Sequence, residues 1–170
     1  MKSMKKGLLV ALIHILLVSS LGAKLLYDRA TRPRIWVQGF SYDPNMPIRG
    51  RYVASRARAD TDYSNEDVKT KGMYYGWRPA HLEVRNGKLF AAKDDDGSVA
   101  ITSWNVGGEV VSAVSEPSLF FIPDTANDPT RLKPGETLWF EATIPRKGPP
   151  RPIRLAISKP NGSFVPLDLK

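Results

Sequence analysis

The chain has 170 residues, a length that suits one domain of ordinary size. It contains no cysteine, which excludes disulfides, cysteine nucleophiles, iron–sulfur clusters, Cys-ligated zinc and a lipid-anchored N-terminal cysteine. Only two histidines are present, so most catalytic triads and histidine-rich metal sites are excluded as well, while the formal net charge of +8 raises the question of nucleic-acid binding.

The first predicted element is an apolar helix over residues 7–27, which follows a lysine-rich segment over residues 1–6. The apolar run is interrupted by Lys24, but a lysine can extend its ammonium to the membrane interface, so the span can continue to Tyr27 and cross a ~30 Å hydrocarbon core. We therefore predict an uncleaved signal anchor. The alternative is a signal peptide cleaved near Gly22, where the small residues match the usual cleavage pattern weakly.

Cations flank both ends of this span, so the positive-inside rule gives no clear orientation. A signal-like N-terminal segment normally carries the chain that follows it across the membrane, and no second apolar span follows. We therefore expect residues 1–6 in the cytoplasm, a basic juxtamembrane segment over residues 28–34, and a domain over residues 35–170 outside the cytoplasm.

Three polar side chains lie within the predicted span, namely His14, Ser19 and Ser20. They are the span positions best able to hydrogen-bond a neighbouring helix, so we predict that they contribute to helix packing. An ionisable residue in mid-membrane is also a functional hypothesis by default. For His14 we favour a neutral imidazole bonded to a partner helix or a backbone carbonyl over a proton relay.

After residue 34 the pattern becomes typical of strands, with β-branched and aromatic runs closed by turn residues. Strands are predicted over residues 35–42, 51–58, 81–84, 88–92, 98–104, 109–114, 118–122, 138–144, 153–158 and 164–169. Residues 60–72 are polar and predict an exposed excursion or a short helix. This pattern predicts a mainly β fold, an antiparallel sandwich or open barrel after one transmembrane helix.

Turn residues predict how some of these strands pair. Asn86-Gly87 is the strongest hairpin signal in the chain, and Asn161-Gly162 predicts a turn into the last strand. The proline-rich segment after residue 144 is expected to join the strands on either side of it. Residues 109–114 and 118–122 are expected to form a further strand pair.

The only acidic cluster, Asp94-Asp95-Asp96-Gly97, predicts a solvated turn, because the carboxylates of a calcium loop are missing after Gly97. No phosphate-binding glycine loop and no nucleophile elbow is present. Glu83 and Glu141 lie among apolar residues and could form a perturbed carboxylate pair, although strand alternation puts each on the solvent face just as readily. We therefore assign no catalytic, cofactor-binding or metal-binding residue, and expect no enzyme and no cofactor.

Four arginines surround Tyr52, a mixture of cations and aromatic residues that single-strand nucleic-acid binders use. Seven of the chain's cations flank the apolar span, however, and the remaining 18 against 17 acidic residues leave a net charge of about +1. Nucleic-acid binding is therefore not expected. These residues instead form a candidate interaction surface, made of Arg49, Arg51, Tyr52, Arg56 and Arg58.

The segment over residues 42–53 resembles the signature region of the GDYXXLXY-domain family of bacterial membrane-anchored proteins. The residues that match are Asp43, Pro44, Arg49, Gly50, Tyr52 and Val53. The chain departs from the family pattern at Arg51, Ser55 and Ala57. Residues 120–124 are also similar to the family's aromatic-Val-Pro-Glu element, and residues 153–169 resemble its closing hairpin.

This resemblance implies a single-pass protein of the bacterial inner membrane with a cytoplasmic N-terminus and a periplasmic β domain. The family has no established activity and is thought to accompany multi-pass membrane proteins. We therefore expect a non-enzymatic accessory domain, with lipids around its helix and a multi-pass membrane protein as partner. Two alternatives stay open: a cleaved periplasmic domain that binds an unknown small ligand between its sheets, and a hydrolase using Glu83 and Glu141.

Overall fold

The computed structural model divides into two compact units, Met1–Arg32 and Pro33–Lys170, and each is described here by itself. The structure describes residues 2–42, 52–64, 66, 68, 73–74, 78–123, 125 and 128–167.

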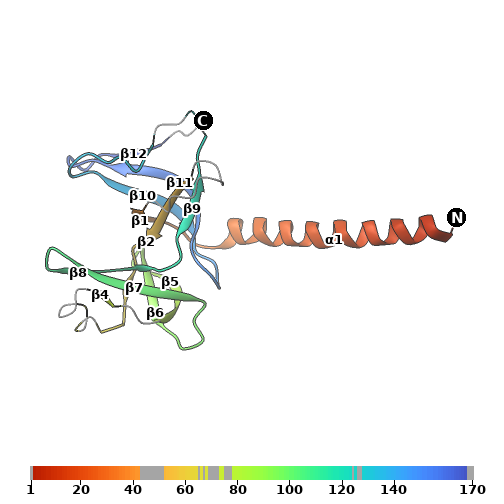
Figure 1. Ribbon diagram of the computed structural model, residues 1–170, viewed down its shortest axis with the longest axis horizontal. Coiled ribbons are helices and arrows are strands. Elements are labelled where there is room, and N and C mark those ends of the chain that lie inside the picture. The colour runs from red at the N-terminus through yellow and green to blue at the C-terminus, as the bar shows by residue number, and fades with distance from the viewer. Residues whose placement is uncertain are drawn as a thin grey trace. The chain divides into compact units, whose positions relative to one another are not determined.

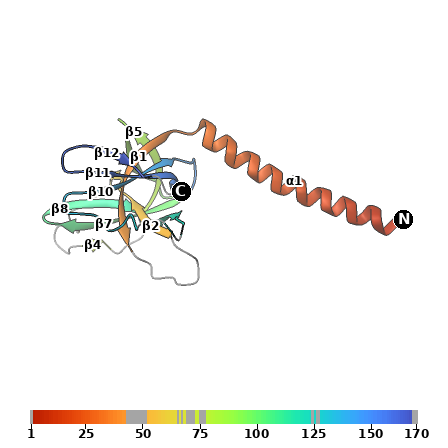
Figure 2. The same cartoon turned by 90° about the horizontal axis from the view of Figure 1, so that it is seen from above.

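The first unit is one uninterrupted helix, α1 (Lys2–Thr31) (Figures 1 and 2). Its stretch Lys6–Thr31 is long and apolar enough to cross a membrane. The predicted helix over residues 7–27 is therefore confirmed, and it is longer by about one turn at each end because the flanking lysines and arginines are good helix formers. The helix ends before Pro33, since a proline disfavours helical backbone at the residue that precedes it.

The second unit is mainly β and mostly antiparallel, which confirms the predicted fold class. Its first six-stranded sheet has the order β12 (Phe164–Pro166), β11 (Arg151–Ser158), β10 (Thr137–Thr143), β1 (Arg34–Tyr42), β2 (Tyr52–Ala57), β9 (Ser118–Phe121). The second has the order β3 (Asp60–Thr61), β6 (Lys88–Lys93), β5 (Pro79–Arg85), β7 (Val99–Val106), β4 (Met73–Tyr74), with β8 (Glu109–Val114) also paired to β7. In Figure 1 these sheets form the upper and lower parts of this unit.

One hydrophobic core joins the two sheets. Alternation along each strand turns one set of side chains inward, and the antiparallel register brings Val37 of β1 opposite Phe140 of β10. The largest fully buried side chains come from both sheets and include Phe140, Leu138, Leu155, Val53, Ile101 and Val99. At Gly39 an added Cβ would collide with the Ser55 hydroxyl and approach the Phe140 ring, so a larger residue there would require these side chains to shift.

The predicted local turns are confirmed. Asn86 and Gly87 have φ values of 51° and 74°, which suit the tight hairpin that joins β5 and β6. Gly162 lies at a φ of 80° between the paired strands β11 and β12. The acidic segment is also a turn, in which the Gly97 amide donates to the Asp94 carbonyl oxygen at 2.8 Å.

The expected pairing of residues 109–114 with 118–122 is wrong, although both segments are strands. Strand β8 pairs with β7, and β9 pairs with β2 in the other sheet. The tight turn lies on the other side of β8, at Gly107-Gly108, where both glycines have positive φ values of 60° and 93°. The segment after β8 contains Pro117, which lacks an N–H group and carries the chain to the other sheet instead of closing a hairpin.

The prediction for residues 60–72 is confirmed in part, since Glu66 and Val68 are helical, and wrong in part. Asp60 and Thr61 form β3, which pairs in parallel with β6, and Val68 is completely buried. The excursion therefore packs one of its apolar side chains into the molecule, and β3 is placed by a strand far along the chain that the local polar pattern does not indicate.

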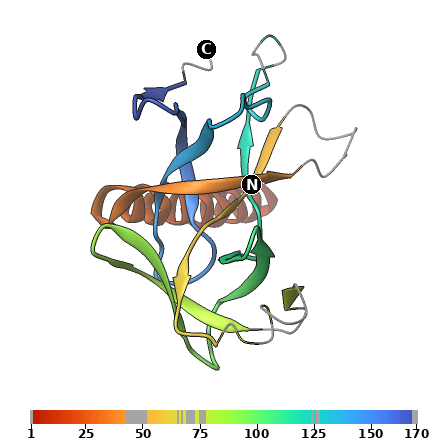
Figure 3. The same cartoon turned by 90° about the vertical axis from the view of Figure 1, so that its left-hand side faces the viewer.

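Strand β1 lies at the centre of its sheet, next to the strands that carry the candidate site. Its first half, Arg34 to Gln38, pairs with β10, and its second half, from Gly39 on, pairs with β2. Figure 3 shows β1 in orange across the middle of the β unit, between the blue strands and the green hairpin.

Candidate ligand-binding site

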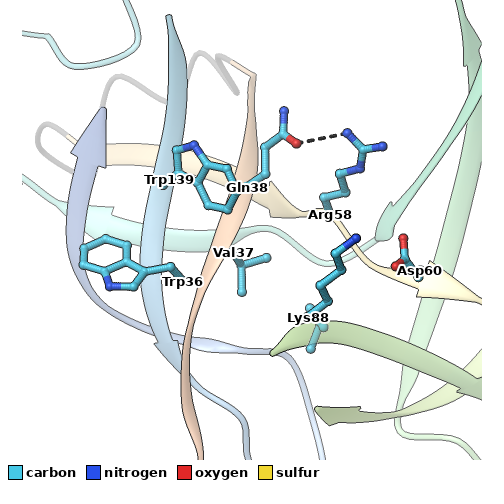
Figure 4. A pocket seen from close by; sticks show the side chains of 8 residues that line it. Trp36, Val37, Gln38, Arg58, Asp60, Lys88 and Trp139 are labelled. Carbon is cyan, nitrogen blue, oxygen red and sulfur yellow. Dashed lines mark hydrogen bonds between the residues drawn. The ribbon is translucent and has the colours of Figure 1, made fainter. Parts of the chain in front are cut away.

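A pocket of about 280 Å³ lies around the middle of β1. It is lined by Trp36, Val37, Gln38, Arg58, Asp60, Lys88, Leu89 and Trp139. Figure 4 shows the two indoles on one side of the β1 ribbon, and Arg58, Lys88 and Asp60 on the other. Val37 and Leu89 belong to the hydrophobic core and supply the apolar part of the lining. The pocket thus has an aromatic wall and a polar wall.

The aromatic wall consists of Trp36 on β1 and Trp139 on β10. Because Gln38 lies opposite Trp139 in the register, the two tryptophans are diagonal neighbours on the same face. The Phe164 ring meets both of them edge-on, with centroid distances of 4.7 Å and 6.3 Å. The Trp139 indole N–H also donates to the Ser158 hydroxyl at 3.1 Å. Both indoles are therefore held in place by their neighbours.

An ion pair supports the same wall from behind. The Arg154 guanidinium donates from Nε to the Glu141 carboxylate at 2.6 Å, and its Cζ lies 5.3 Å from the centre of the Trp36 ring. A cation over the face of an indole is attracted by the ring's quadrupole. Together with the Phe164 contact, this contact gives Trp36 two constraints on its orientation.

On the polar wall, Arg58 is fixed by two side chains. Its Nη1 donates to Gln38 Oε1 at 3.0 Å, and its Nη2 donates to Glu109 Oε1 at 2.8 Å. The Arg58 amide donates to the Gln38 carbonyl oxygen at 2.9 Å, so backbone and side chain are both tied to β1. The guanidinium charge is balanced by Glu109, and the Gln38 amide nitrogen forms no hydrogen bond within the described part of the chain.

Lys88 and Asp60 complete the polar wall. Lys88 is the first residue of β6, and Asp60 is the first residue of β3. Both are exposed, and within the part of the chain that the structure describes neither side chain forms an ion pair or a hydrogen bond. The pocket therefore offers one ammonium and one carboxylate with no intramolecular partner.

These groups suit binding better than covalent chemistry. No hydroxyl or thiol in the pocket lies beside a base, and the described residues contain no group of three or more His, Asp or Glu side chains placed to hold a metal ion. Aromatic side chains held by their neighbours, together with a few polar groups, are typical of a ligand site.

The structure brings only one residue of the predicted interaction surface to this pocket, namely Arg58. Arg49 and Arg51 lie outside the described residues. Tyr52 lies at the opposite end of β2, with its ring centroid 6.3 Å from that of Phe121. Arg56 shares the face of Tyr52 by strand alternation and is half-buried.

Glu83 and Glu141, the possible carboxylate pair, lie on different sheets. Glu83 is on β5 and forms an ion pair with Arg85, while Glu141 is on β10 and forms an ion pair with Arg154. Each carboxylate thus has its own cation as partner, which gives no support to a shared acid–base site.

Helix α1 does not bring its three polar residues onto one face. At about 100° per residue, His14, Ser19 and Ser20 lie about 100–140° apart around the axis. His14 Nδ1 lies 2.8 Å from the Val10 carbonyl oxygen, and the Ser20 hydroxyl donates to the Leu17 carbonyl oxygen at 2.8 Å. Two of the three therefore bond to their own helix.

Sequence reasoning missed the residues that form most of the pocket. Trp36 and Gln38 were assigned only to a strand, and Trp139 lies in another strand about a hundred residues away. One signal was available, because alternation places Trp36 and Gln38 on the same face of the predicted strand. The partner of that face depends on the register with β10.

Comparison with protein-family models, curated proteins and solved structures gives no match for this chain.

Proposed function

We propose that this chain is a membrane-anchored, non-catalytic binding domain whose β unit takes up a small molecule in the pocket around β1. One observation carries the proposal: Lys88 and Asp60, which have no partner among the described residues, present charges beside two indoles that their neighbours hold in place. The indoles and Arg58 are already oriented, so they lose little conformational entropy when a ligand binds, and the two charges remain available to it. That property is expected of a binding pocket.

In this proposal α1 remains attached as a single span in a bacterial inner membrane, with the N-terminus in the cytoplasm and the β unit in the periplasm. The apolar character of Leu25, Leu26 and Tyr27, beyond the possible cleavage point, supports an uncleaved anchor. The cysteine-free composition is compatible with an extracytoplasmic domain.

The proposal predicts that a small molecule stabilises the full-length protein through this pocket. In thermal unfolding of the detergent-solubilised chain against a metabolite library, at least one compound should raise the Tm. At a concentration of 100 times Kd the stabilisation is about 2.7 kcal/mol, which corresponds to a shift of several degrees. The same compound should leave the Tm of a Trp139→Ala, Lys88→Ala double variant unchanged.

The matched control is Lys93→Ala, which removes an exposed lysine at the other end of β6, outside the pocket lining. This variant should respond to the compound as the unmodified protein does. A compound that stabilises the double variant and the unmodified chain equally acts elsewhere, and a library without any stabilising compound would count against a ligand pocket.

A second candidate function is that of an accessory subunit of a multi-pass membrane protein, and His14 favours it. A carbonyl oxygen only accepts, so the Nδ1 atom next to Val10 carries the proton and the neutral ring leaves Nε2 as an acceptor. The same helical face carries Gly7, Ala11, Val18 and Gly22, and no other atom lies within 4 Å of a Cβ built at either glycine. Small residues with one polar group are typical of packing between spans.

Cross-linking in native membranes tests this second function. With a photoreactive amino acid at Ala11, we expect one discrete protein adduct, whereas the same group at Leu16 on the opposite face should react with lipid only. Adding His14→Leu should reduce the Ala11 adduct severalfold, because one interhelical hydrogen bond contributes about 1 kcal/mol. Equal cross-linking from both faces would contradict a defined partner.

Ser20→Ala is the control for that experiment. Its hydroxyl already bonds to the Leu17 carbonyl oxygen, so its removal should leave the adduct unchanged.

A further inference from the structure

We propose that the ligand of the pocket around β1 is a neutral sugar, held as a single pyranose ring. This inference rests on the proposed binding function and names the chemical class of the ligand. A pyranose has an apolar face of C–H groups and a rim of hydroxyls that donate and accept hydrogen bonds. The two walls of the pocket match these two parts.

The aromatic wall provides the surface for the C–H face. Trp36 and Trp139 are diagonal neighbours on adjacent strands, and Phe164, Arg154 and Ser158 restrict their orientation. An indole has a negative face, which attracts the slightly positive C–H groups of a sugar ring. A rigid platform of this kind needs no rearrangement before a flat apolar surface packs against it.

The polar wall provides both donors and acceptors. Lys88 and the Gln38 amide nitrogen donate, while Asp60 accepts, and Arg58 is positioned between them by its bonds to Gln38 and Glu109. Hydroxyl groups can satisfy both kinds of partner at once. A ligand that only accepts hydrogen bonds would leave the Asp60 carboxylate without a donor.

The charges of the pocket favour a neutral ligand over a phosphate ester. Glu109 already balances the charge of Arg58, and the Lys88 ammonium faces the same pocket as the Asp60 carboxylate. An anion-binding site normally presents cations or helix N-termini without nearby carboxylates. Attraction of the two cations for an added anion is offset here by the two acids.

The size of the pocket favours one ring. Its volume of about 280 Å³ lies just below the range of roughly 300–1,000 Å³ that is usual for drug-sized ligands. A single sugar unit, either free or at the end of a glycan, fits this volume better than a nucleotide with base, ribose and phosphate.

The test is a titration of the full-length protein in nanodiscs with small molecules, in which isothermal titration calorimetry measures binding. Maltoside and glucoside detergents must be avoided, because their sugar headgroups would compete for the pocket. The probes are glucose, galactose, mannose and N-acetylglucosamine, with sorbitol as a hydroxyl-rich molecule without a ring, and with AMP as a charged aromatic ligand. We expect at least one of the four sugars to bind with a millimolar dissociation constant, and sorbitol not to bind.

Substitutions locate the site. Trp139→Ala should weaken sugar binding at least tenfold, whereas Trp139→Phe keeps an aromatic platform and should weaken it less than threefold. Asp60→Asn should weaken binding severalfold and alter which sugar is preferred. The matched control is Trp104→Phe on β7, which packs against Phe40 at a centroid distance of 5.2 Å outside the pocket and should bind as the unmodified protein does.

Each outcome decides the proposal. The proposal is supported if a sugar binds to the unmodified chain and to Trp104→Phe with the same affinity but does not bind to Trp139→Ala. Equal binding of sorbitol, or tighter binding of AMP than of every sugar, overturns the sugar assignment and leaves the binding function standing. If neither a sugar nor any library compound acts through the pocket, the sugar assignment and the binding function are both overturned.

Discussion

Replacing Gly97 by alanine is expected to lower the free energy of unfolding of the β unit by about 3 kcal/mol or more. A Cβ at this position would lie 2.5 Å from both the carbonyl carbon and the carbonyl oxygen of Ala80, far closer than van der Waals contact. Ala80 is completely buried and pairs with Val99 of β7, so its backbone has no room to move. The substitution must therefore displace β5 from β7.

Thermal unfolding measures the effect of Gly97→Ala, with an expected fall in Tm of roughly 10 °C for a unit of this size. Gly107→Ala is the matched control. That glycine has a φ of 60°, but nothing lies within 4 Å of an added Cβ, so the cost is limited to about 1–2 kcal/mol of backbone strain. If both variants lose the same stability, the close approach to Ala80 is not the reason for Gly97.

Replacing Arg78 by methionine is expected to destabilise the β unit by about 3 kcal/mol. Arg78 is only 4% exposed, and its guanidinium donates to the Ser103 hydroxyl at 3.0 Å and to the Ser64 carbonyl oxygen at 2.6 Å. Methionine fills a similar volume but offers no donor. The buried Ser103 hydroxyl would keep only its bond to Ser112, and the Ser64 carbonyl oxygen would lose a charged donor; hydrogen bonds to charged groups contribute about 1.5–3 kcal/mol each.

Arg78 also connects two parts of the β unit. Its Cζ lies 5.2 Å from the centre of the Tyr63 ring, so the side chain links the segment after β3 to β7. Chemical denaturation of the Arg78→Met variant should report the lost stability. Relative to the unmodified protein, the rate of hydrogen exchange should increase more in residues 60–64 than in the rest of the β unit. Arg146→Met, at an exposed arginine, should change stability by less than about 0.5 kcal/mol. Comparable effects of the two substitutions would contradict a structural role for Arg78.

The parts of the fold that the sequence predicts well depend on local physics. The apolar run that forms α1 and the turn at Asn86-Gly87 are decided by neighbouring residues, and both are confirmed. The pairing of β8 and β9 is not local. Gly107-Gly108 and Pro117 indicate which side of β8 has a tight turn and which does not. The sheet to which each strand belongs depends on packing across the whole unit.

The candidate site is harder to predict for the same reason. Trp36 and Trp139 line the same pocket only through the register of β1 with β10, and the parallel pairing of β3 with β6 places Asp60 near Lys88. A cluster of arginines near Tyr52 is conspicuous in the sequence, yet of its two described arginines, Arg56 and Arg58, only Arg58 lines the pocket. Clustering along the chain is a poor guide to proximity in a fold whose strands pair over long separations.

The junction between the two units is short. Only residues 32 and 33 separate α1 from β1, and the carbonyl oxygen of Pro33 already accepts a hydrogen bond from the Ile144 amide. Two residues span at most ~7 Å, so this tether has almost no reach. In the proposed anchored form, this short link would confine the β unit to the membrane surface, without the reach that a long flexible linker gives. A copy cut near residue 22 would keep every lining residue and lose that confinement.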